Sequence, residues 1–338
     1  MNMTVFCRLQ NVKPSGYMCI CNFCPYCKVR YSAELCDTYI DSLIQEIHLV
    51  GSQHTERKKV TSLYFGGGTP ALAAHRIKEI VAALKEHFVI TEGIGIELHP
   101  DNVNVAVLQA LKDAGVTKIS IGVQSFCHKY QKLLGRKKLD TDKLLSALSA
   151  VPFETVSMDF IFALPGQTYD DLKSDIETAF SLGANHIAIY PFIDFTFTES
   201  PLAAMPKKDK RRLLDAITQY CLDMGYFRSS VWTFSSEPNA SYSSMTRDTF
   251  LGFGCSATSL FKGQFKINTF DVASYCERIS SGDLATALTI RFTKRQRMIY
   301  WLFWTAYSTR VNAKAFETFF GVPLKKMYGI ELWLAKQF

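Results

Sequence analysis

The sequence of 338 residues lacks both the long apolar runs of membrane proteins and the leader pattern of secreted ones. No stretch approaches the roughly 18 uninterrupted apolar residues that a membrane-spanning helix needs. The first residues, Met1–Val5, do not show the charged and then apolar order of a signal peptide. We therefore expect a cytoplasmic protein without a membrane span.

A strong excess of charge of one sign is also missing. The chain has 38 basic and 31 acidic residues, which gives a net charge of +7. The densest basic run, Lys207–Arg212, has no interleaved aromatic residue and is typical of the solvated start of a helix. We therefore expect no nucleic-acid partner. The 48% apolar and 20% charged composition excludes a disordered chain.

Short β-rich runs alternate with longer amphipathic stretches over the first 191 residues. The expected strands are Tyr17–Ile20, Val60–Phe65, Gly95–Leu98, Lys118–Val123, Thr155–Leu164 and His186–Pro191. The expected helices are Ser32–Val50, Leu72–Phe88, Val103–Ala114, Asp140–Ala150 and Tyr169–Leu182. This alternation predicts an α/β fold with a parallel sheet. Six such strands can curl into a partial (β/α)6 barrel, whose sites lie at the carboxyl ends of the strands.

The pattern changes after about residue 192. Asp209–Met224 is expected to be a helix and Tyr226–Phe234 a strand, whereas the chain from Arg291 is helical and aromatic. We expect the partial barrel with its cysteine loop over 1–195, an extension associated with it over 196–290 and a truncated helical domain over 291–338. The carboxyl-terminal region is thus a smaller α+β and helical part. An aromatic stripe on its helix is usually core, namely Tyr300, Trp301, Phe303, Trp304 and Tyr307.

Four of the ten cysteines crowd into residues 19–27, namely Cys19, Cys21, Cys24 and Cys27. Without a secretory leader a disulfide framework is not expected, so the cluster indicates metal binding or redox chemistry. The other six stand singly and are expected to be small buried residues: Cys7, Cys36, Cys127, Cys221, Cys255 and Cys276. The seven histidines show no metal-ligand spacing.

Three interpretations of the cysteine cluster stay open on spacing alone. Cys21, Cys24 and Cys27 are separated by two successive two-residue gaps, and three thiolates on one short loop suit an iron–sulfur cluster. Structural zinc usually takes two separated ligand pairs, and no second pair stands at the expected distance downstream. A thioredoxin-like redox motif would not need three or four cysteines. The spacing favours the iron–sulfur cluster.

A glycine run, Gly66–Pro70, follows an expected strand and opens an expected helix. Its three glycines allow positive φ and close backbone approach, so that amide N–H groups can face a carboxylate or an amino-acid ligand. The run lacks the Gly-Lys-Ser/Thr ending of a P-loop and the glycine spacing of a dinucleotide-binding motif. A tight turn without a ligand is equally compatible with it.

Further short blocks continue in the same order along the chain. They are Glu97–Pro100, Ser120–Phe126, Leu134–Arg136, Met158–Ile161, Leu164–Thr168, His186–Tyr190 and Phe250–Ala257. With the cysteine loop and the glycine run they cover about residues 17–320. In this order the chain resembles the radical S-adenosylmethionine (SAM) enzymes, specifically the oxygen-independent coproporphyrinogen III oxidase family with its haem-chaperone relatives.

The resemblance implies a [4Fe–4S] cluster held by three cysteines. In that family the reduced cluster binds the amino and carboxylate groups of SAM, and one electron breaks a C–S bond to give a 5′-deoxyadenosyl radical. Cys24 and Cys27 are implied as ligands. The family spacing has Cys-x3-Cys, but Ile20 stands at that position, so Cys21 is the expected first ligand and Cys19 the alternative.

The resemblance also implies the residues that bind SAM. Tyr26 is expected against the adenine, and Gly67, Gly68 and Thr69 at the methionyl amino end. The remaining polar groups of SAM are expected to meet the side chains of Glu97, Gln124, Arg136 and Asp159. These types suit the chemistry, since a guanidinium can fork onto a carboxylate and a carboxylate can hold ribose hydroxyls.

The leading functional expectation is an enzyme, a radical SAM oxidoreductase or C-methyltransferase. It would bind one or two SAM molecules, receive electrons from a reductase, flavodoxin or ferredoxin, and act on a tetrapyrrole or similar planar substrate. The alternative is a haem chaperone that binds and delivers haem without oxidase activity, which the missing amino-terminal extension of the oxidases favours. A third is a homologue whose altered cysteine loop no longer holds iron.

Overall fold

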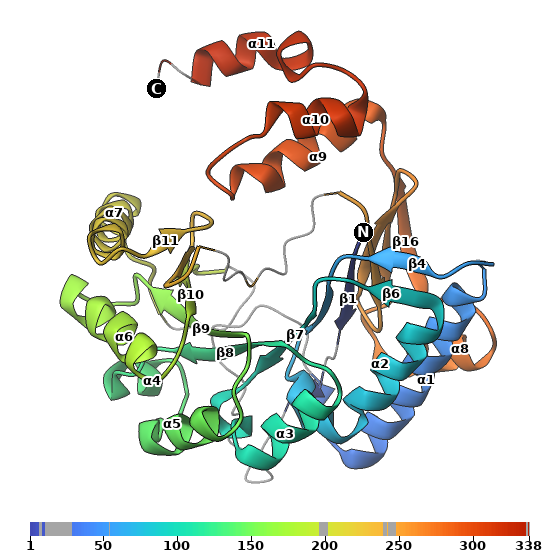
Figure 1. Ribbon diagram of the computed structural model, residues 1–338, viewed down its shortest axis with the longest axis horizontal. Coiled ribbons are helices and arrows are strands. Elements are labelled where there is room, and N and C mark those ends of the chain that lie inside the picture. Colours follow the sequence, from blue (N-terminus) through green and yellow to red (C-terminus); the bar gives the residue numbers. More distant parts are fainter. Residues whose placement is uncertain are drawn as a thin grey trace.

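The computed structural model describes residues 1–6, 9–10, 29–53, 55–195, 202–238, 242, 248–335 and 337. Its main feature is one strongly curved sheet of twelve strands in the order β11-β12-β10-β9-β8-β7-β5-β1-β13-β14-β15-β16 (Figure 1). The sheet is open and mixed, and seven consecutive strands, from β10 to β13 in this order, are parallel. The expected α/β fold with a parallel sheet is confirmed.

Six of the parallel strands are β1 (Asn2–Phe6), β5 (Leu63–Gly66), β7 (Ile94–Leu98), β8 (Lys118–Gln124), β9 (Thr155–Phe162) and β10 (His186–Pro191), and the seventh, β13 (Phe250–Phe253), pairs with β1. Their side chains are largely buried on both faces, as is usual for parallel strands covered by helices. Because all six run in one direction, their carboxyl ends lie at one edge of the sheet.

One expectation about these strands was wrong, and another lies outside the described residues. The first strand of the sheet along the chain is β1, which the sequence analysis did not predict as a strand. The expected first strand, Tyr17–Ile20, lies outside the described residues. The expected strand Val60–Phe65 is two strands in different sheets, β4 (Lys58–Val60) and β5. The strand is interrupted between them, where the Thr61 N–H donates a hydrogen bond to the Met1 carbonyl at 2.8 Å.

Helices cover the convex side of the sheet (Figure 1). They are α1 (Ala33–Gly51), α2 (Ile77–His87), α3 (Val105–Asp113), α4 (His128–Leu133), α5 (Thr141–Ala150), α6 (Tyr169–Ser181) and α7 (Lys207–Asp223), with short 3₁₀ turns η1 (Pro70–Arg76) and η2 (Pro100–Asn102). Several begin at a side chain that caps the first turn, as Ser32 and Thr168 do. Four of the five helices expected in this region are confirmed within two residues at each end, whereas the expected helix Leu72–Phe88 is the 3₁₀ turn η1 followed by α2.

Further strands extend the sheet at both edges. On one side lie β13 (Phe250–Phe253), β14 (Thr258–Phe261), β15 (Gln264–Asn268) and β16 (Thr286–Arg291), with α8 (Val272–Ser280) packed on α1. On the other lie β12 (Thr233–Ser235) and β11 (Phe227–Arg228). Two small sheets pair β2 (Leu9–Gln10) with β3 (Val29–Arg30) and β4 with β6 (Phe88–Ile90).

A buried carboxylate joins α1 to this extension. Glu46 accepts hydrogen bonds from the Gly254 N–H at 2.7 Å, from the Asn268 side-chain amide at 2.8 Å and from the Tyr275 hydroxyl at 2.8 Å. Burial raises the pKa of Glu46 to about 7 although these three bonds oppose the shift. Glu46 therefore stabilises the packing of α1 against β13, β15 and α8 through three donors.

The last three helices, α9 (Lys294–Ala306), α10 (Ala313–Phe320) and α11 (Leu324–Ala335), lie across the open side of the curved sheet (Figure 1). They have a core of their own, which includes Trp301 and Phe316. The aromatic stripe was expected to be core, and this is correct only for Trp301. Phe303 is 55% exposed, and Tyr300, Trp304 and Tyr307 are half-buried. Among the described helices, none is long and apolar enough to cross a membrane.

Candidate functional site

The carboxyl ends of β5, β7, β8 and β9 bring the predicted SAM-binding residues to one region. Gly67, Gly68 and Thr69 follow β5, and Glu97 lies one residue before the end of β7. The other three come from the next strands and the loop beyond them: Gln124 ends β8, Arg136 follows α4 and Asp159 lies on β9. The structure thus places all the described members of the predicted set on adjacent strands and their loops.

Glu97 is held by the glycine run. Its carboxylate accepts hydrogen bonds from the Tyr64 hydroxyl and, at 3.2 Å, from the Gly67 N–H. Gly67 has φ +101°, which glycine adopts without strain. A Cβ at Gly66 would lie 2.5 Å from Cε1 of Tyr64 and 3.2 Å from Cδ of Glu97. The first two glycines therefore give room and a donor to the Tyr64–Glu97 pair.

A second carboxylate lies two strands away from Glu97. Asp159 accepts a hydrogen bond from the Ser120 hydroxyl at 2.8 Å and a longer one from the Ser157 hydroxyl at 3.5 Å. Burial raises the pKa of Asp159 to about 7, and the charge of Glu97 adds to this shift. Burial also raises the pKa of Glu97. Both carboxyl groups therefore favour a ligand that brings positive charge or hydrogen-bond donors.

No lysine, arginine or histidine of the described residues forms an ion pair with Glu97 or Asp159. Buried carboxylates normally have a cation or a full set of donors, because an isolated buried charge is costly. A shifted pair of this kind at the edge of a parallel sheet is typical of a binding or catalytic site.

The positive side of the site comes from Arg136. Its guanidinium donates hydrogen bonds to the carbonyls of Gly122 and Val123 on β8, the second at 3.4 Å. Burial, and to a smaller extent the charge of Arg136, lower the pKa of His99 to about 4. His99 is therefore neutral at physiological pH, and Arg136 supplies the cationic group of this corner.

Backbone strain marks the end of β8. Gln124 has φ +71°, a left-handed conformation that residues other than glycine seldom adopt. A Cβ at Gly122 would lie 2.9 Å from Nε2 of the Gln124 side chain, so the glycine makes room for that amide. Strained residues at the carboxyl end of a strand are common at binding sites, where they direct a side chain toward a ligand.

Tyr242 is a site residue that the sequence did not predict. Its ring packs edge-on against Tyr64, with ring centroids 5.4 Å apart, and a Cβ at Gly95 would lie 3.1 Å from its Cε2. Its hydroxyl is enclosed and makes no hydrogen bond of normal geometry with a described residue. Burial, and then the charge of Glu97, raise the pKa of Tyr242 well above its usual value. No motif in the sequence singles out this tyrosine.

The predicted cluster ligands Cys19, Cys21, Cys24 and Cys27, and also Tyr26, lie outside the described residues. Of the single cysteines, Cys36, Cys221 and Cys255 are buried as expected, Cys127 and Cys276 are only half-buried, and Cys7 is not described. Burial raises the pKa of Cys36 to about 11 and that of Cys221 to about 12, so both are protonated thiols at neutral pH.

The described residues fit SAM chemically. SAM carries an ammonium and a sulfonium cation, a carboxylate and ribose hydroxyls. The site offers two half-buried carboxylates without a described cationic partner, a guanidinium, and a glycine turn in which a Cβ at Gly66 would collide with its neighbours. Each charged group of SAM thus has a group of opposite charge or a hydrogen-bond acceptor among the described residues.

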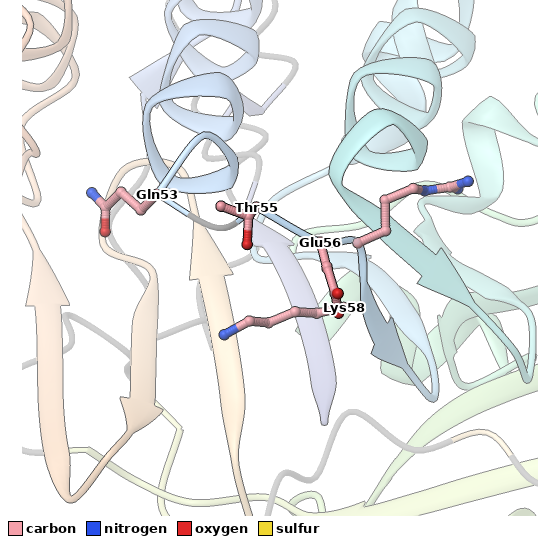
Figure 2. A pocket seen from close by; sticks show the side chains of 5 residues that line it. Gln53, Thr55, Glu56 and Lys58 are labelled. Atoms are coloured by element: carbon pink, nitrogen blue, oxygen red, sulfur yellow. The ribbon is translucent and has the colours of Figure 1, made fainter.

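A separate surface pocket lies in the connection between α1 and β4 (Figure 2). It is lined by Gln53, Thr55, Glu56, Arg57 and Lys58, the last of which begins β4, and includes none of the predicted site residues. Its lining side chains are mostly exposed. The candidate site is therefore the group of side chains at the carboxyl ends of the strands.

Comparisons with known proteins identify the family of this chain. The family model of the radical SAM superfamily matches residues 16–179. Over 72% of this chain the sequence is 31% identical to the heme chaperone HemW of Lactococcus lactis, and the match covers 67% of that protein. It is 27% identical to the heme chaperone HemW of Bacillus subtilis, over 77% of this chain and 73% of that protein.

Oxidases of the same group are also similar. The oxygen-independent coproporphyrinogen III oxidase of Pseudomonas aeruginosa is 24% identical over 78% of this chain, which spans only 64% of that protein. The solved structure of coproporphyrinogen III oxidase (HemN) from Escherichia coli, a radical SAM enzyme, has the same fold. It matches with a TM-score of 0.81 at 20% identity, over 99% of this chain and 83% of that one. The chain therefore belongs to the radical SAM superfamily, within the family that joins HemW haem chaperones and oxygen-independent coproporphyrinogen III oxidases.

Proposed function

We propose that the protein is a haem chaperone that keeps the cofactor site of a radical SAM protein. The observation that carries this proposal is the similarity to two proteins named heme chaperone HemW, at 31% and 27% identity. The sequence alone had placed the enzyme first and the chaperone second, and these relatives support the second expectation better. Relatives named heme chaperone HemW and relatives named oxygen-independent coproporphyrinogen III oxidase are both similar to this chain.

The proposal assigns a [4Fe–4S] cluster to Cys21, Cys24 and Cys27, with Cys19 as the alternative first ligand. When bound, the cluster and SAM supply one-electron chemistry. Glu97, oriented by Tyr64 and Gly67, is proposed to accept hydrogen bonds from the ammonium group of SAM. Glu97 lies beside the loop of Gly68 and Thr69, so the glycine run is proposed to line the site at the ammonium end of SAM.

The remaining side chains are proposed to bind the rest of SAM. Asp159, held by Ser120, accepts hydrogen bonds from the ribose hydroxyls, and Arg136 pairs with the carboxylate. Gln124 offers its amide from the strained end of β8, and Tyr26 packs against the adenine. In each case the described side chain is already oriented by its own hydrogen bond or by a rigid strand.

A half-exposed aromatic surface on α9 and β15 is proposed to contact haem. Phe265 and Phe292 stack with ring centroids 5.8 Å apart, and Tyr300 lies 6.2 Å from Phe265. The row continues to Trp304, which is 6.2 Å from Tyr300 and stacks on Tyr307 at 5.7 Å. A continuous row of rings suits a flat macrocycle, and α9 lies over the open side of the sheet (Figure 1).

The decisive experiment titrates haem into anaerobic, cluster-loaded protein and follows the Soret band. We expect saturable uptake of one haem per chain, weakened at least about tenfold, or about 1.4 kcal/mol, in a Tyr300→Ala/Trp304→Ala double variant. Phe227→Ala, which removes an exposed aromatic ring on β11, is the matched control and is expected to bind haem normally. Absence of saturable uptake would rule out the chaperone.

The second candidate is the enzyme. The polar groups at the carboxyl ends of the strands, complete in the described part of the chain, and the similarity to the Pseudomonas oxidase favour it. Dithionite-reduced protein with added SAM and coproporphyrinogen is tested for 5′-deoxyadenosine and for S-adenosylhomocysteine. Repeated turnover without stoichiometric haem uptake would identify an oxidase or, if S-adenosylhomocysteine accumulates, a methyltransferase.

A further inference from the structure

We propose that His48, Glu86 and His87 form a binding site for a divalent cation of the zinc type, separate from the cysteine cluster. His48 lies near the carboxyl end of α1, and the other two end α2. Nδ1 of His48 is 3.0 Å from Nε2 of His87 and 3.8 Å from a carboxylate oxygen of Glu86. The three ligand atoms all lie within 4.8 Å of one another.

These separations suit a single tetrahedral metal ion. Zinc binds imidazole nitrogen and carboxylate oxygen at about 2.0–2.1 Å, which places two ligands of a tetrahedral ion about 3.3 Å apart. The observed separations of 3.0 and 3.8 Å lie on either side of that value. Two imidazoles and one carboxylate leave a fourth position for water. Calcium and magnesium prefer an all-oxygen set, so an imidazole-binding transition metal is the better match.

A glycine in α1 makes this arrangement possible. A Cβ at Gly51 would lie 2.2 Å from Cγ of His87 and 2.4 Å from its Cδ2, so the His87 ring rests directly on the α1 backbone. His48 lies three residues before Gly51, on the same face of that helix. The two rings are therefore brought together by packed helices and do not depend on a loop.

The two imidazoles are close enough to share a proton or a metal ion. At 3.0 Å one neutral ring donates its N–H to the lone pair of the other, and a metal ion that replaces this proton would bind both nitrogens. Glu86 adds a negative charge beside this pair. The side chains of His48 and Glu86 are 43% and 63% exposed, so a cation can reach the site from solution.

The test adds Zn²⁺, and separately Co²⁺ as a coloured probe, to anaerobic protein that carries its iron–sulfur cluster. We expect one Zn²⁺ per chain in competition with a chromophoric chelator. The Co²⁺ spectrum should show weak d–d bands without the near-ultraviolet charge transfer of thiolate ligands. That spectrum separates this site from binding at cysteines, and thiolate charge transfer alone would overturn the proposal.

Variants identify the ligands. Loss of a partner that only orients a metal ligand costs 10–100-fold in affinity, so His48→Ala and His87→Ala should each weaken Zn²⁺ binding by at least about tenfold. Glu86→Gln should weaken it less. His75→Ala is the control, because His75 is an exposed histidine with a single carboxylate, that of Asp37, at 3.9 Å.

Zn²⁺ affinity that is unchanged in His48→Ala and Glu86→Gln would overturn the site, as would wild-type protein that binds neither ion. These two substitutions are at exposed side chains, so they decide the question even if His87→Ala does not fold. A rise in the Tm of the wild-type protein with Zn²⁺, absent in His48→Ala, is the second readout, since a metal would link α1 to α2.

Discussion

The Tyr64 hydroxyl donates a hydrogen bond to the Glu97 carboxylate across two neighbouring parallel strands. The Gly67 N–H donates to the other oxygen of the same carboxylate. Both bonds lower the pKa of Glu97 against the larger effect of burial, which raises it. The two bonds therefore favour the ionised form of a half-buried carboxyl group at the point where the proposed function needs an acceptor for an ammonium group.

Replacement of Tyr64 tests this relationship. Tyr64→Phe removes a hydrogen bond to a charged group, which is worth about 1.5–3 kcal/mol, and raises the pKa of Glu97 further. We expect the Kd for SAM to rise about 10- to 100-fold in cluster-loaded protein, measured by isothermal titration calorimetry.

The matched control for that substitution is Tyr220→Phe. Tyr220 also donates to a glutamate, Glu177, at 2.9 Å, but this pair lies on the outer helices α6 and α7. SAM binding should be unchanged in this variant. Equal effects of the two substitutions would argue against a role of Tyr64 in ligand binding.

Asp159 should make the stability of the protein depend on pH. Its pKa of about 7 in the folded protein is above the ordinary value of 3.8, so the folded state binds a proton more tightly than the unfolded state. This contribution to stability is complete below about pH 4 and is lost as the pH rises through 7. In Asp159→Asn the free energy of unfolding should therefore decrease less between pH 5.5 and 8 than in the wild type.

Urea denaturation at both pH values measures this difference. Glu46, with a pKa of about 7, contributes to the pH dependence of both proteins, so the comparison isolates Asp159. Asp215→Asn, at an exposed residue of α7, is the control and should follow the wild type. If Asp159→Asn also follows the wild type, the carboxyl group is ionised in the folded protein at pH 5.5 and our account of the site is wrong.

Gly67→Ala should impair ligand binding by more than its backbone strain explains. A side chain at φ +101° is strained by about 1–2 kcal/mol, and the movement that relieves it would take the Gly67 N–H away from Glu97. Gly183→Ala is the matched control, because Gly183 has φ +91° and open space around a new Cβ. Both variants should lose similar stability, whereas only Gly67→Ala should lose SAM affinity by calorimetry.

The sequence predicted the parts of the site that follow from strand order. Glu97, Gln124 and Asp159 lie on strands that alternate with helices, and that alternation alone brings their carboxyl ends to one edge. The roles of these residues came from the family motifs, not from the alternation. The hydrogen bond from Gly67 to Glu97 was not predicted, because spacing does not show which acceptor an amide will meet.

Other features could not be predicted because they depend on tertiary contacts between distant segments. Tyr242 reaches Tyr64 from a stretch without periodicity, and no local pattern marks it. His48 and His87 meet only because α1 packs on α2 at Gly51, although the histidines show no ligand spacing in the sequence. The strand Asn2–Phe6 is too short for a period-2 pattern to be distinguished from an irregular segment.

Truncation of the buried Glu46 side chain should strongly lower the free energy of unfolding. Glu46→Ala leaves three buried donors, on Gly254, Asn268 and Tyr275, without their acceptor, and each unsatisfied group costs about 1–3 kcal/mol. We expect the free energy of unfolding to fall by about 3–5 kcal/mol at pH 8, measured by urea denaturation. At pH 5.5 the wild-type carboxyl is protonated and still accepts hydrogen bonds, so the loss should persist there.

Glu56→Ala, at an exposed residue in the connection after α1, should change stability by less than about 0.5 kcal/mol. A similar small effect for Glu46→Ala would mean that α1 and the β13–α8 region are held together by apolar packing alone.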